Sequence, residues 1–388
     1  MSSAPIQDID LATFNFDPYP VLDLLRNNFP ITYVPQLKAT LFSKHRDIFI
    51  CEKNIEIFSS VQPDGLMTKL MGQNMMRKDG ATHMAERKAI FPTVSPKTVK
   101  NFWRNQFVDK TNEILSDLRD KKELEIVSEF STQVSAEALK LITGLSGMKW
   151  IEMDRVSQGM IDGCSNYIGD PVIAKNCEDC TRSIDLHIDA QLEDTKLHNA
   201  PSLLSSQLEA GMSMQAIKAN IKLAISGGQN EPRDAIAGTI GTLLENRSQL
   251  EMIMSGTKTW LQAFEEYARW MSPIGMSPRR IAKKFIYKNV EFYENDMIFF
   301  MFGSANRDEA IFQNPDCFDI SRDNGPSIAF GAGPHFCAGS WVSKTLIAEV
   351  ALPLFFAHFP NVYLKKPIEF QGWAFRGPKE VILENRNK

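Results

Sequence analysis

A single cysteine, Cys337, stands in a sequence suited to binding a large flat group. Residues 330–339 read F-G-A-G-P-H-F-C-A-G, and their three glycines and one proline oppose a regular helix or strand while allowing tight turns. After Gly339 the sequence becomes apolar and helical, so the sulfur would lie near a helix N-terminus, where a negative charge is stabilised. We interpret Cys337 as the thiolate ligand of a haem iron. The alternative is a buried structural cysteine beside a glycine turn.

Two basic residues farther upstream are spaced to hold an anion. His83 and Arg87 lie four residues apart in a run that begins at Asp79 and has the pattern of a capped helix start. On a helix the two side chains would share one face. An ordinary solvated surface would explain the pair equally well. Pro92 and Pro96 are expected to close this helix.

A third candidate lies where a long helical pattern over residues 216–250 is interrupted. The interruption reads S-G-G-Q-N-E-P at residues 226–232. Glycines weaken a helix, and Pro232 cannot donate to the carbonyl of Gly228, so we expect a kink whose freed carbonyl binds water. Glu231 is the titratable residue at this point. The alternative is a plain loop between two helices.

The rest of the chain supplies the elements that must position these residues. Residues 1–50 predict a small helix followed by short strands, and residues 97–220 predict a series of amphipathic helices with little β signal. No linker divides the 388 residues, so we expect one large domain over 1–388. Hydrophobic residues make up 43% of the chain, which is enough for a large core.

Composition limits the partners and the compartment. A net charge of −4 gives no general reason to bind nucleic acid. The six scattered cysteines and the polar N-terminal sequence predict a reducing cytoplasm, and no apolar run approaches the length of about eighteen residues that a membrane span needs. Cys177 and Cys180 form a lone C-x-x-C, for which surface thiols are the default interpretation and a metal or redox role is the alternative.

The stretch around Cys337 matches the F-G-x-G-x-[HR]-x-C-x-G signature of the cytochrome P450 family at every fixed position. The whole chain resembles a soluble bacterial member. The resemblance implies a mainly α fold with small β-sheets, in which haem b lies between a long central helix and the Cys loop. It also implies a single haem domain, in a monomer, that receives electrons from NAD(P)H through a ferredoxin and a ferredoxin reductase.

The same resemblance assigns haem-binding roles to particular residues. They are Phe330, His335, Cys337 and Gly339 of the Cys loop, together with His83, Arg87 and Arg280. Cys337 would bind the iron, and the basic side chains would pair with the haem propionates. Arg279 is the fallback for Arg280.

The family also carries a buried E-x-x-R pair that supports folding. The corresponding residues are Glu266 and Arg269, which lie one helical turn apart. Arg322 is the candidate third member of this network, because buried charges need such partners.

One position departs from the family pattern. Where the family has an acid followed by an alcohol that steer protons to iron-bound dioxygen, this chain has Asn230 followed by Glu231. An amide cannot titrate, so Glu231 with a water molecule is the predicted proton donor, and Gln229 and Asn230 would orient that water. The run G-G-x-[NQ]-E-P-R-D resembles P450s that remove O-methyl groups, such as guaiacol O-demethylase and the enzymes that demethylate 6-O-methyl-D-galactose.

The predicted activity is oxidative O-demethylation of a small methoxylated compound, with release of formaldehyde. A methyl sugar such as 6-O-methyl-D-galactose is favoured over a methoxyarene by polar residues in the loop expected over the haem, although solvent exposure would also explain them. These residues are Ser59, Ser60, Gln62, Gln73 and Asn74. Alternatives are hydroxylation of a terpenoid or another apolar molecule, peroxide-driven oxidation aided by Glu231, and a haem-thiolate sensor without turnover.

An acidic ferredoxin is the predicted electron donor, because the chain has no room for a second redox domain. Lys344, Arg87 and Lys88 are the basic residues expected to form its docking face.

Overall fold

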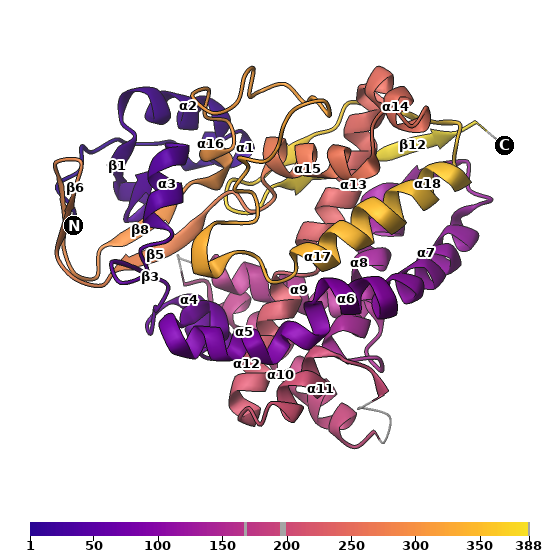
Figure 1. Cartoon of the computed structure of the whole chain (residues 1–388), viewed down its shortest axis with the longest axis horizontal. Coiled ribbons are helices and arrows are strands. Elements are labelled where there is room, and N and C mark those ends of the chain that lie inside the picture. The colour runs from indigo at the N-terminus through magenta and orange to yellow at the C-terminus, as the bar shows by residue number, and fades with distance from the viewer. Residues whose placement is uncertain (167–168, 195–198, 387–388) are drawn as a thin grey trace. The chain divides into compact units, whose positions relative to one another are not determined.

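The computed structural model describes residues 1–166, 169–194 and 199–386 (Figure 1). Helices predominate and the strands are short, which confirms the predicted mainly α fold with small β-sheets. The chain divides into two compact units. The first comprises residues 1–62, 238–337 and 366–380, and the second comprises residues 63–237, 338–365 and 381–388. The single haem domain over residues 1–388 stays a prediction.

The first unit contains a five-stranded sheet. Its strands, in spatial order, are β1 (Ile31–Val34), β2 (Ala39–Phe42), β8 (Met297–Phe300), β5 (Ser277–Ile281) and β3 (Phe58–Ser59). β2 and β8 are parallel, whereas the other neighbouring pairs are antiparallel. In Figure 1 the indigo strands from the start of the chain therefore lie beside the orange strands of a much later segment. α3 (His45–Cys51) and β5, the strand that carries Arg279 and Arg280, both belong to this unit.

Two small hairpins complete the strands of the first unit. They are β6 (Phe285–Tyr287) with β7 (Val290–Phe292), and β10 (Phe370–Gln371) with β11 (Gly377–Pro378). Phe42 packs against Phe58, Phe292 and Phe300, with ring centroids between 5.6 and 5.7 Å apart. Aromatic side chains of this kind fit the half-buried, pleated surface of a sheet and fix its register.

Residues 1–50 begin with helices and continue into short strands, as predicted. Besides α3, the helices of the first unit are α1 (Leu11–Phe16), α2 (Tyr19–Asn28), α14 (Arg247–Met254), α15 (Trp260–Met271) and α16 (Phe302–Ala305), with 3₁₀ turns η1 (Pro35–Leu37) and η6 (Gly333–His335). A capping box starts α15, because Thr259 accepts from the Gln262 amide while the Gln262 side chain accepts from the Thr259 amide. α13 (Asn230–Glu245) runs through both units.

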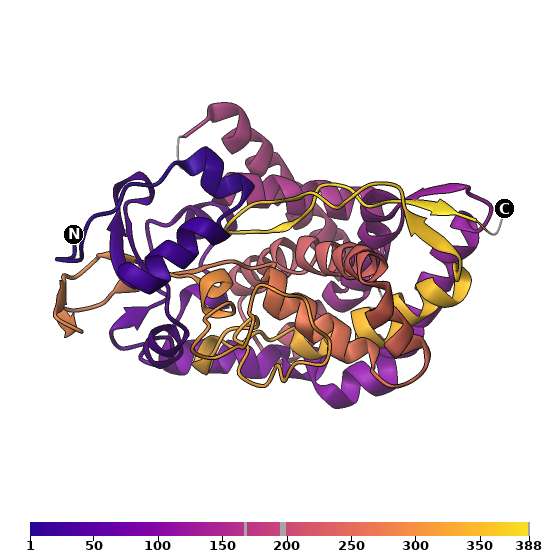
Figure 2. The ribbon, with the colours of Figure 1, turned by 90° about the horizontal axis from the view of Figure 1, so that it is seen from above.

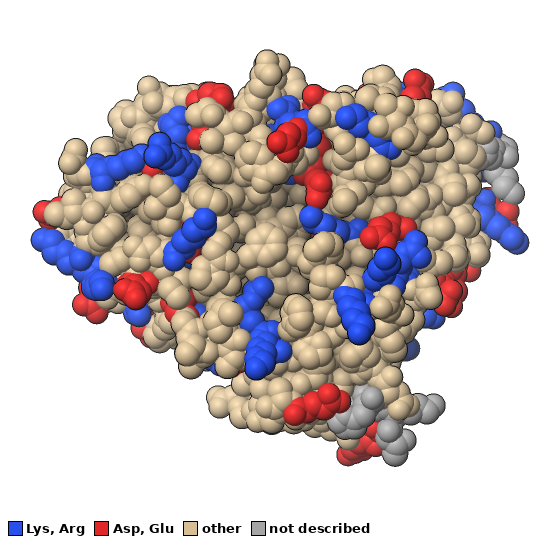
Figure 3. Space-filling model, in the orientation of Figure 1, with Lys and Arg blue, Asp and Glu red and all other residues tan. Residues whose placement is uncertain are grey.

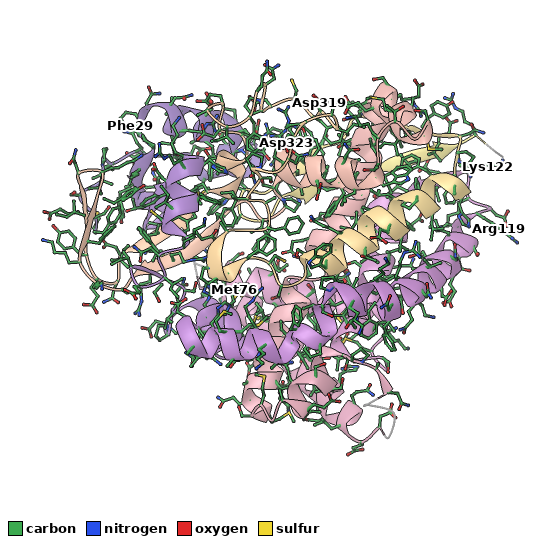
Figure 4. All side chains as sticks on the ribbon, viewed as in Figure 1. Phe29, Met76, Arg119, Lys122, Asp319 and Asp323 are labelled. Atoms are coloured by element: carbon green, nitrogen blue, oxygen red, sulfur yellow. The ribbon has the colours of Figure 1, made fainter. Side chains whose placement is uncertain are left out.

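The predicted buried charge network is present in the first unit. Arg269 Nη2 lies 2.8 Å from Glu266 Oε1, and both side chains are fully buried. Arg322 Nε lies 3.2 Å from the same oxygen. Arg269 also donates to the carbonyls of Asn306 and Pro315. All three expected members are therefore joined, and they tie α15 to the segment that leads to the Cys loop; Figure 4 labels Asp319 and Asp323 in that segment.

The second unit is almost entirely helical. Its longer helices are α5 (Gly80–Val94), α7 (Arg104–Leu118), α8 (Thr132–Thr143), α9 (Trp150–Cys164), α10 (Pro171–Leu192) and α12 (Met214–Ser226). Its shorter helices are α4 (Leu66–Met71), α6 (Pro96–Thr98), α11 (Leu203–Glu209), α17 (Ser340–Lys344) and α18 (Leu352–His358). η2 (Met75–Arg77) is a 3₁₀ turn, and η3 (Val99–Trp103), η4 (Val127–Ser131) and η7 (Thr345–Ala351) are π-helical segments. Met76, labelled in Figure 4, belongs to η2, which packs against α5.

A three-stranded sheet joins distant parts of the second unit. Its strands are β4 (Glu123–Glu125), β12 (Ile382–Asn385) and β9 (Val362–Leu364), in that order. Figure 2 shows the yellow C-terminal strand β12 beside the purple β4. Buried apolar residues of α8, α9, α10 and α12 form the core of this unit.

The predicted end of α5 is confirmed: the helix ends at Val94, within residues 91–96, although Pro92 itself lies inside it. One local interpretation was wrong. Cys177 and Cys180 are not surface thiols: both are fully buried in α10, where they pack against Gly163 and Gly159 of α9. No group of three or more His, Cys, Asp or Glu residues that could hold a metal ion occurs within residues 1–166, 169–194 and 199–386.

A further expectation concerned long apolar segments. In the part of the chain that the structure describes, residues Ser340–His358 form one helix that is long and apolar enough to cross a membrane by length and composition alone. Within it, 56% of the most apolar window is buried inside the protein. A core helix passes the same test, so this segment is weak support for a membrane span.

Candidate functional site

The Cys loop lies in the first unit and is shaped by its glycines. Gly331 and Gly333 have φ angles of +78° and +69°, a left-handed conformation that glycine adopts without strain. The Cys337 amide donates to the Phe330 carbonyl at 2.9 Å, which closes the loop as a tight turn. Cys337 forms no disulfide and is of intermediate burial, unlike the fully buried thiols of α10. The loop therefore holds a single accessible sulfur on a constrained backbone.

The two ends of the loop are anchored differently. Phe330 packs edge-on against Phe264 of α15, with ring centroids 6.2 Å apart. After the loop, Gly339 is the N-cap residue of α17, and the predicted apolar helix follows directly. His335 is the last residue of η6 and is half-buried. Every Cys-loop residue singled out in the sequence is thus placed on the loop or at the start of the helix that follows it.

Strand β5 separates the two candidate arginines, because successive side chains of a strand point to opposite faces. Arg279 is buried and its Nη2 lies 3.0 Å from Glu52 Oε1. Arg280 is half-buried and donates from Nη1 to Asn295 Oδ1 at 2.9 Å, while its buried Nε makes no hydrogen bond within the described residues. Arg280 therefore keeps a donor available for a carboxylate, whereas Arg279 is held by Glu52.

The second unit carries the other basic candidates. His83 and Arg87 both lie on α5, four residues apart, so they share one face as expected. His83 is 2% exposed and Arg87 is half-buried. A histidine buried to this extent does not belong to an ordinary solvated surface pair, so His83 does not fit that alternative.

The interruption of the long helical pattern is a short connection between two helices, so the expected kink in one continuous helix was wrong and the alternative is correct. α12 ends at Ser226 and α13 begins at Asn230, so residues 227–229 connect two helices and Pro232 falls in the first turn of α13. Proline is tolerated there because first-turn amides have no partner in the helix. The Ser135 hydroxyl lies 3.3 Å from the Gly228 carbonyl and 2.7 Å from the Gln229 carbonyl. The carbonyl expected to bind water thus has a protein donor nearby.

The three candidate proton-handling residues differ in their partners. Gln229 Nε2 donates to the Thr132 carbonyl and to Asp154 Oδ1, both at 3.2 Å, and its Oε1 is buried without a partner in the described residues. Asn230 Nδ2 donates to Gln158 Oε1 at 3.1 Å, and its Oδ1 accepts from Ser157. The Asn230 amide is therefore occupied by helix α9, whereas Gln229 keeps an acceptor. Their predicted role in orienting water stays a prediction.

Glu231 differs from these two amide residues in its hydrogen bonding. Both of its carboxylate oxygens are buried and accept no hydrogen bond within the described residues, although the residue as a whole is only half-buried. Burial raises the pKa of Glu231 to about 7, because desolvation disfavours the charged carboxylate. The nearby charge of Asp234 raises this pKa further, and Arg233 opposes the rise. The side chain can therefore carry a proton at neutral pH.

The residues of the first unit fit the haem that the sequence predicts. A haem iron takes a cysteine thiolate, and the Cys loop offers one partly accessible sulfur that is not in a disulfide. The propionates of haem need donors, and Arg280 has a buried Nε without a protein partner among the described residues. The left-handed glycines keep side chains away from the turn before the sulfur.

Sequence reasoning missed one buried acid in this unit. Glu52 follows α3 and is 2% exposed, yet its partners Arg279 and Ala332 lie 227 and 280 positions away in the sequence. No local spacing signals such long-range contacts. A charged residue at the end of the apolar run of α3 was the only available hint.

Comparison with known proteins finds similarity to cytochrome P450 proteins. The family model described as "Cytochrome P450" matches residues 242–363. The chain is 23% identical over 355 residues to a "Putative cytochrome P450 YjiB" of Bacillus subtilis, covering 89% of this chain and 88% of that protein. It is 22% identical over 398 residues to an "Epothilone C/D epoxidase" of Sorangium cellulosum, covering 95% and 93% of the two chains.

Solved structures share the same fold. P450BioI, solved in complex with an acyl carrier protein ligated to hexadec-9Z-enoic acid, superposes with a TM-score of 0.87 at 20% identity and covers 96% of this chain and 100% of its own. CalO2 superposes with a TM-score of 0.87 at 21% identity, covering 97% and 98% of the two chains.

Proposed function

Because the chain belongs to the cytochrome P450 family and is a P450 monooxygenase, we propose that its reaction is the oxidative O-demethylation of a small methoxylated compound. The family uses haem b and electrons from NAD(P)H that redox partners deliver. None of the relatives named above has a name that describes an O-demethylase, so the proposal rests on this chain's own residues. The single observation that carries it is Glu231, a buried acid in place of the family's alcohol.

The proposed reaction balances as follows. One methyl ether, one dioxygen, two electrons and two protons give one alcohol, one formaldehyde and one water. Haem bound through a thiolate supplies the oxygen chemistry that inserts one oxygen atom into a methyl C–H bond. The resulting hemiacetal breaks its C–O bond to release formaldehyde and the alcohol. The protein must bind the ether, exclude stray water and deliver the two protons.

We assign the proton delivery to Glu231. Its carboxyl oxygens are enclosed and unbonded, and its pKa of about 7 lets it hold a proton at neutral pH and release it during turnover. Gln229 lies two residues before Glu231 in the chain, and its Oε1 has no protein partner in the described residues. We therefore assign Gln229 to hold a water beside Glu231. Cys337 is assigned to the iron, and His83, Arg87, Arg280 and His335 to the propionates.

The burial of polar loop residues supports a polar substrate. Ser59, Ser60 and Gln62 of the first unit are all buried, so solvent exposure does not explain them. In the second unit Gln73 is exposed, whereas Asn74 is fully buried and both of its amide atoms lack a hydrogen-bond partner in the described residues. A buried amide normally has partners, so Asn74 can both donate to and accept from a hydroxylated ligand. A methyl sugar offers such groups, and a methoxyarene offers fewer.

Ligand binding gives the direct test. We would titrate the ferric protein with 6-O-methyl-D-galactose, with guaiacol and with D-galactose, following the shift of the haem Soret band, and measure formaldehyde per NADH consumed. The proposal predicts a shift and formaldehyde with the methyl sugar and no formaldehyde with D-galactose. Shift and turnover with guaiacol alone would move the substrate to the methoxyarenes, and no response to either ether would overturn O-demethylation.

A matched pair of variants tests the loop assignment. Asn74→Leu should weaken methyl-sugar binding by about tenfold, because one buried hydrogen bond is worth about that factor. Gln73→Leu, at the exposed neighbouring position, should leave binding unchanged. Equal effects of the two changes would show that Asn74 has no specific contact with the ligand.

The remaining assignments concern the setting of the enzyme. We propose a cytoplasmic monomer, in keeping with six cysteines that form no disulfide in the structure. A ferredoxin and its reductase are the proposed electron donors. Arg87, Lys88 and Lys344 all belong to the second unit, and Figure 3 shows further Lys and Arg side chains over its α5 to α7 region.

A further inference from the structure

The buried carboxylate of Glu52 touches two separate parts of the first unit. Its Oε1 accepts from Arg279 Nη2 at 3.0 Å, and its Oε2 accepts from the Ala332 amide at 2.5 Å. Arg279 belongs to β5, and Ala332 lies in the Cys loop, five residues before Cys337. One side chain, itself 2% exposed, therefore ties the Cys loop to the central sheet.

The Cys loop lies directly against Glu52 and its neighbour. A β-carbon added at Gly331 would lie 3.5 Å from Glu52 Oε1, and one added at Gly333 would lie 3.1 Å from the Lys53 Cα and 3.2 Å from the Glu52 carbonyl oxygen. The left-handed turn thus brings bare backbone against the end of α3. The close approach lets the Ala332 amide reach the carboxylate.

Arg279 is a rigid partner for this carboxylate. Its Nη1 donates to the Ser277 hydroxyl at 2.6 Å and to the Pro278 carbonyl at 2.8 Å, both within β5. β5 is paired on both sides, with β8 and with β3. Burial raises the pKa of Glu52, and Arg279 and the Ala332 amide oppose that rise. The guanidinium therefore both orients Glu52 and favours its charged form.

Other hydrogen bonds hold the backbone before and within the Cys loop. Asn306 Oδ1 accepts from the Ile328 amide at 2.9 Å, which holds the residues before the loop. Within the loop, backbone hydrogen bonds join Cys337 to Phe330 and Phe336 to Gly333. Glu52 contacts the left-handed turn itself, through the Ala332 amide.

We infer that Glu52, oriented by Arg279, is a positioning residue that fixes the Cys loop and thereby the place of the Cys337 sulfur. The inference rests on the assignment of Cys337 as the haem ligand. Glu52 touches neither haem nor substrate in this role and acts through the backbone of the turn. Its removal should free the turn first and alter sulfur coordination as a consequence.

The test compares Glu52→Gln with Asp47→Asn. Asp47 lies on α3, which Glu52 directly follows, and is 1% exposed, but its partners are the Tyr287 hydroxyl at 2.9 Å and Lys288 Nζ at 2.6 Å, away from the Cys loop. Both variants replace one buried carboxylate by an amide. A glutamine has one oxygen, so it cannot keep both acceptor contacts of Glu52.

Two readouts are needed, one of which is independent of haem. Amide hydrogen exchange of residues 330–337, measured in the haem-free protein, should be about tenfold faster in Glu52→Gln and unchanged in Asp47→Asn, since a hydrogen bond to a charged group is worth about that factor or more. In the haem-loaded protein, the reduced carbon monoxide complex of Glu52→Gln should lose part of its thiolate-type absorption, while Asp47→Asn keeps all of it.

Each outcome decides the inference. Unchanged exchange of the loop in Glu52→Gln, or equal acceleration in both variants, would overturn it. If Glu52→Gln does not fold, Arg279→Lys is measured instead, and a smaller acceleration confined to the same residues is expected; no acceleration refutes the inference. A parent protein without thiolate-type absorption would refute the ligand assignment, while the exchange measurement still decides the role of Glu52.

Discussion

Replacing the Glu231 carboxylate by an amide is the most informative perturbation of the proposed chemistry. Glu231→Gln keeps the shape of a side chain whose oxygens have no protein partner in the described residues, so substrate binding should stay within about twofold. Proton delivery should fail instead. General acid catalysis is worth a factor of roughly 10² to 10⁴, and formaldehyde release should fall by that factor.

The pH dependence follows from the buried carboxyl group. With a pKa of about 7, roughly half of Glu231 is protonated at pH 7 and about a tenth at pH 8. Turnover of the parent enzyme should therefore fall about tenfold per unit above neutral pH. The Glu231→Gln variant should lack this fall. Because the pKa is raised on folding, the contribution of Glu231 to stability is present at acidic pH and is lost as the pH rises towards 7.

The assay follows NADH consumption, peroxide release and formaldehyde release in parallel. In Glu231→Gln, electrons should be consumed slowly or leak to peroxide. The Asn230→Asp change is the milder control, because it adds an acid where one is already present. Formaldehyde release by Glu231→Gln at the parent rate, with the parent pH profile, would refute the role of Glu231 and leave it a residue of the first turn of α13.

Three further predictions concern other parts of the molecule. Glu266→Gln should lower the free energy of unfolding by about 3 to 5 kcal/mol in urea denaturation, because it leaves the charges of Arg269 and Arg322 uncompensated. The control Glu251→Gln, at an exposed site, should change this free energy little, and equal effects of the two variants would contradict the network. Turnover with a ferredoxin should fall as salt rises, since a Debye length of about 8 Å screens Arg87, Lys88 and Lys344, and a rate that ignores ionic strength would exclude this docking face. In the haem-loaded protein, iodoacetamide should modify exposed Cys317 first and reach Cys177 and Cys180 only after unfolding, and fast native labelling of the latter pair would contradict their burial in α10.

Sequence motifs located the elements that depend on local backbone chemistry. The glycines and proline around Cys337 predicted a turn followed by a helix, and the structure has η6, the loop and α17 in that order. The spacing of Glu266 and Arg269 predicted a pair on one helix face, which α15 contains. Such features are readable because spacing along one helix or turn determines which side chains meet.

Contacts between distant segments were not readable in the same way. The role of Glu52 depends on β5 and the Cys loop being brought together by the sheet, which no spacing near Glu52 reports. The C-x-x-C motif was misjudged because a lone motif carries no sign of its surroundings, while α9 supplies two glycines against which both thiols pack. Likewise, the partners of Gln229 and Asn230 come from α8 and α9, far from the helix break in sequence.

The account depends most directly on Cys337 as the ligand of a haem iron. The reduced carbon monoxide complex of the parent protein should show the thiolate-type absorption, and Cys337→His should retain haem while losing that absorption completely. The Cys51→Ser variant, which changes a buried cysteine of α3, is the control and should keep the parent spectrum. Thiolate-type absorption that persists in Cys337→His would contradict the account.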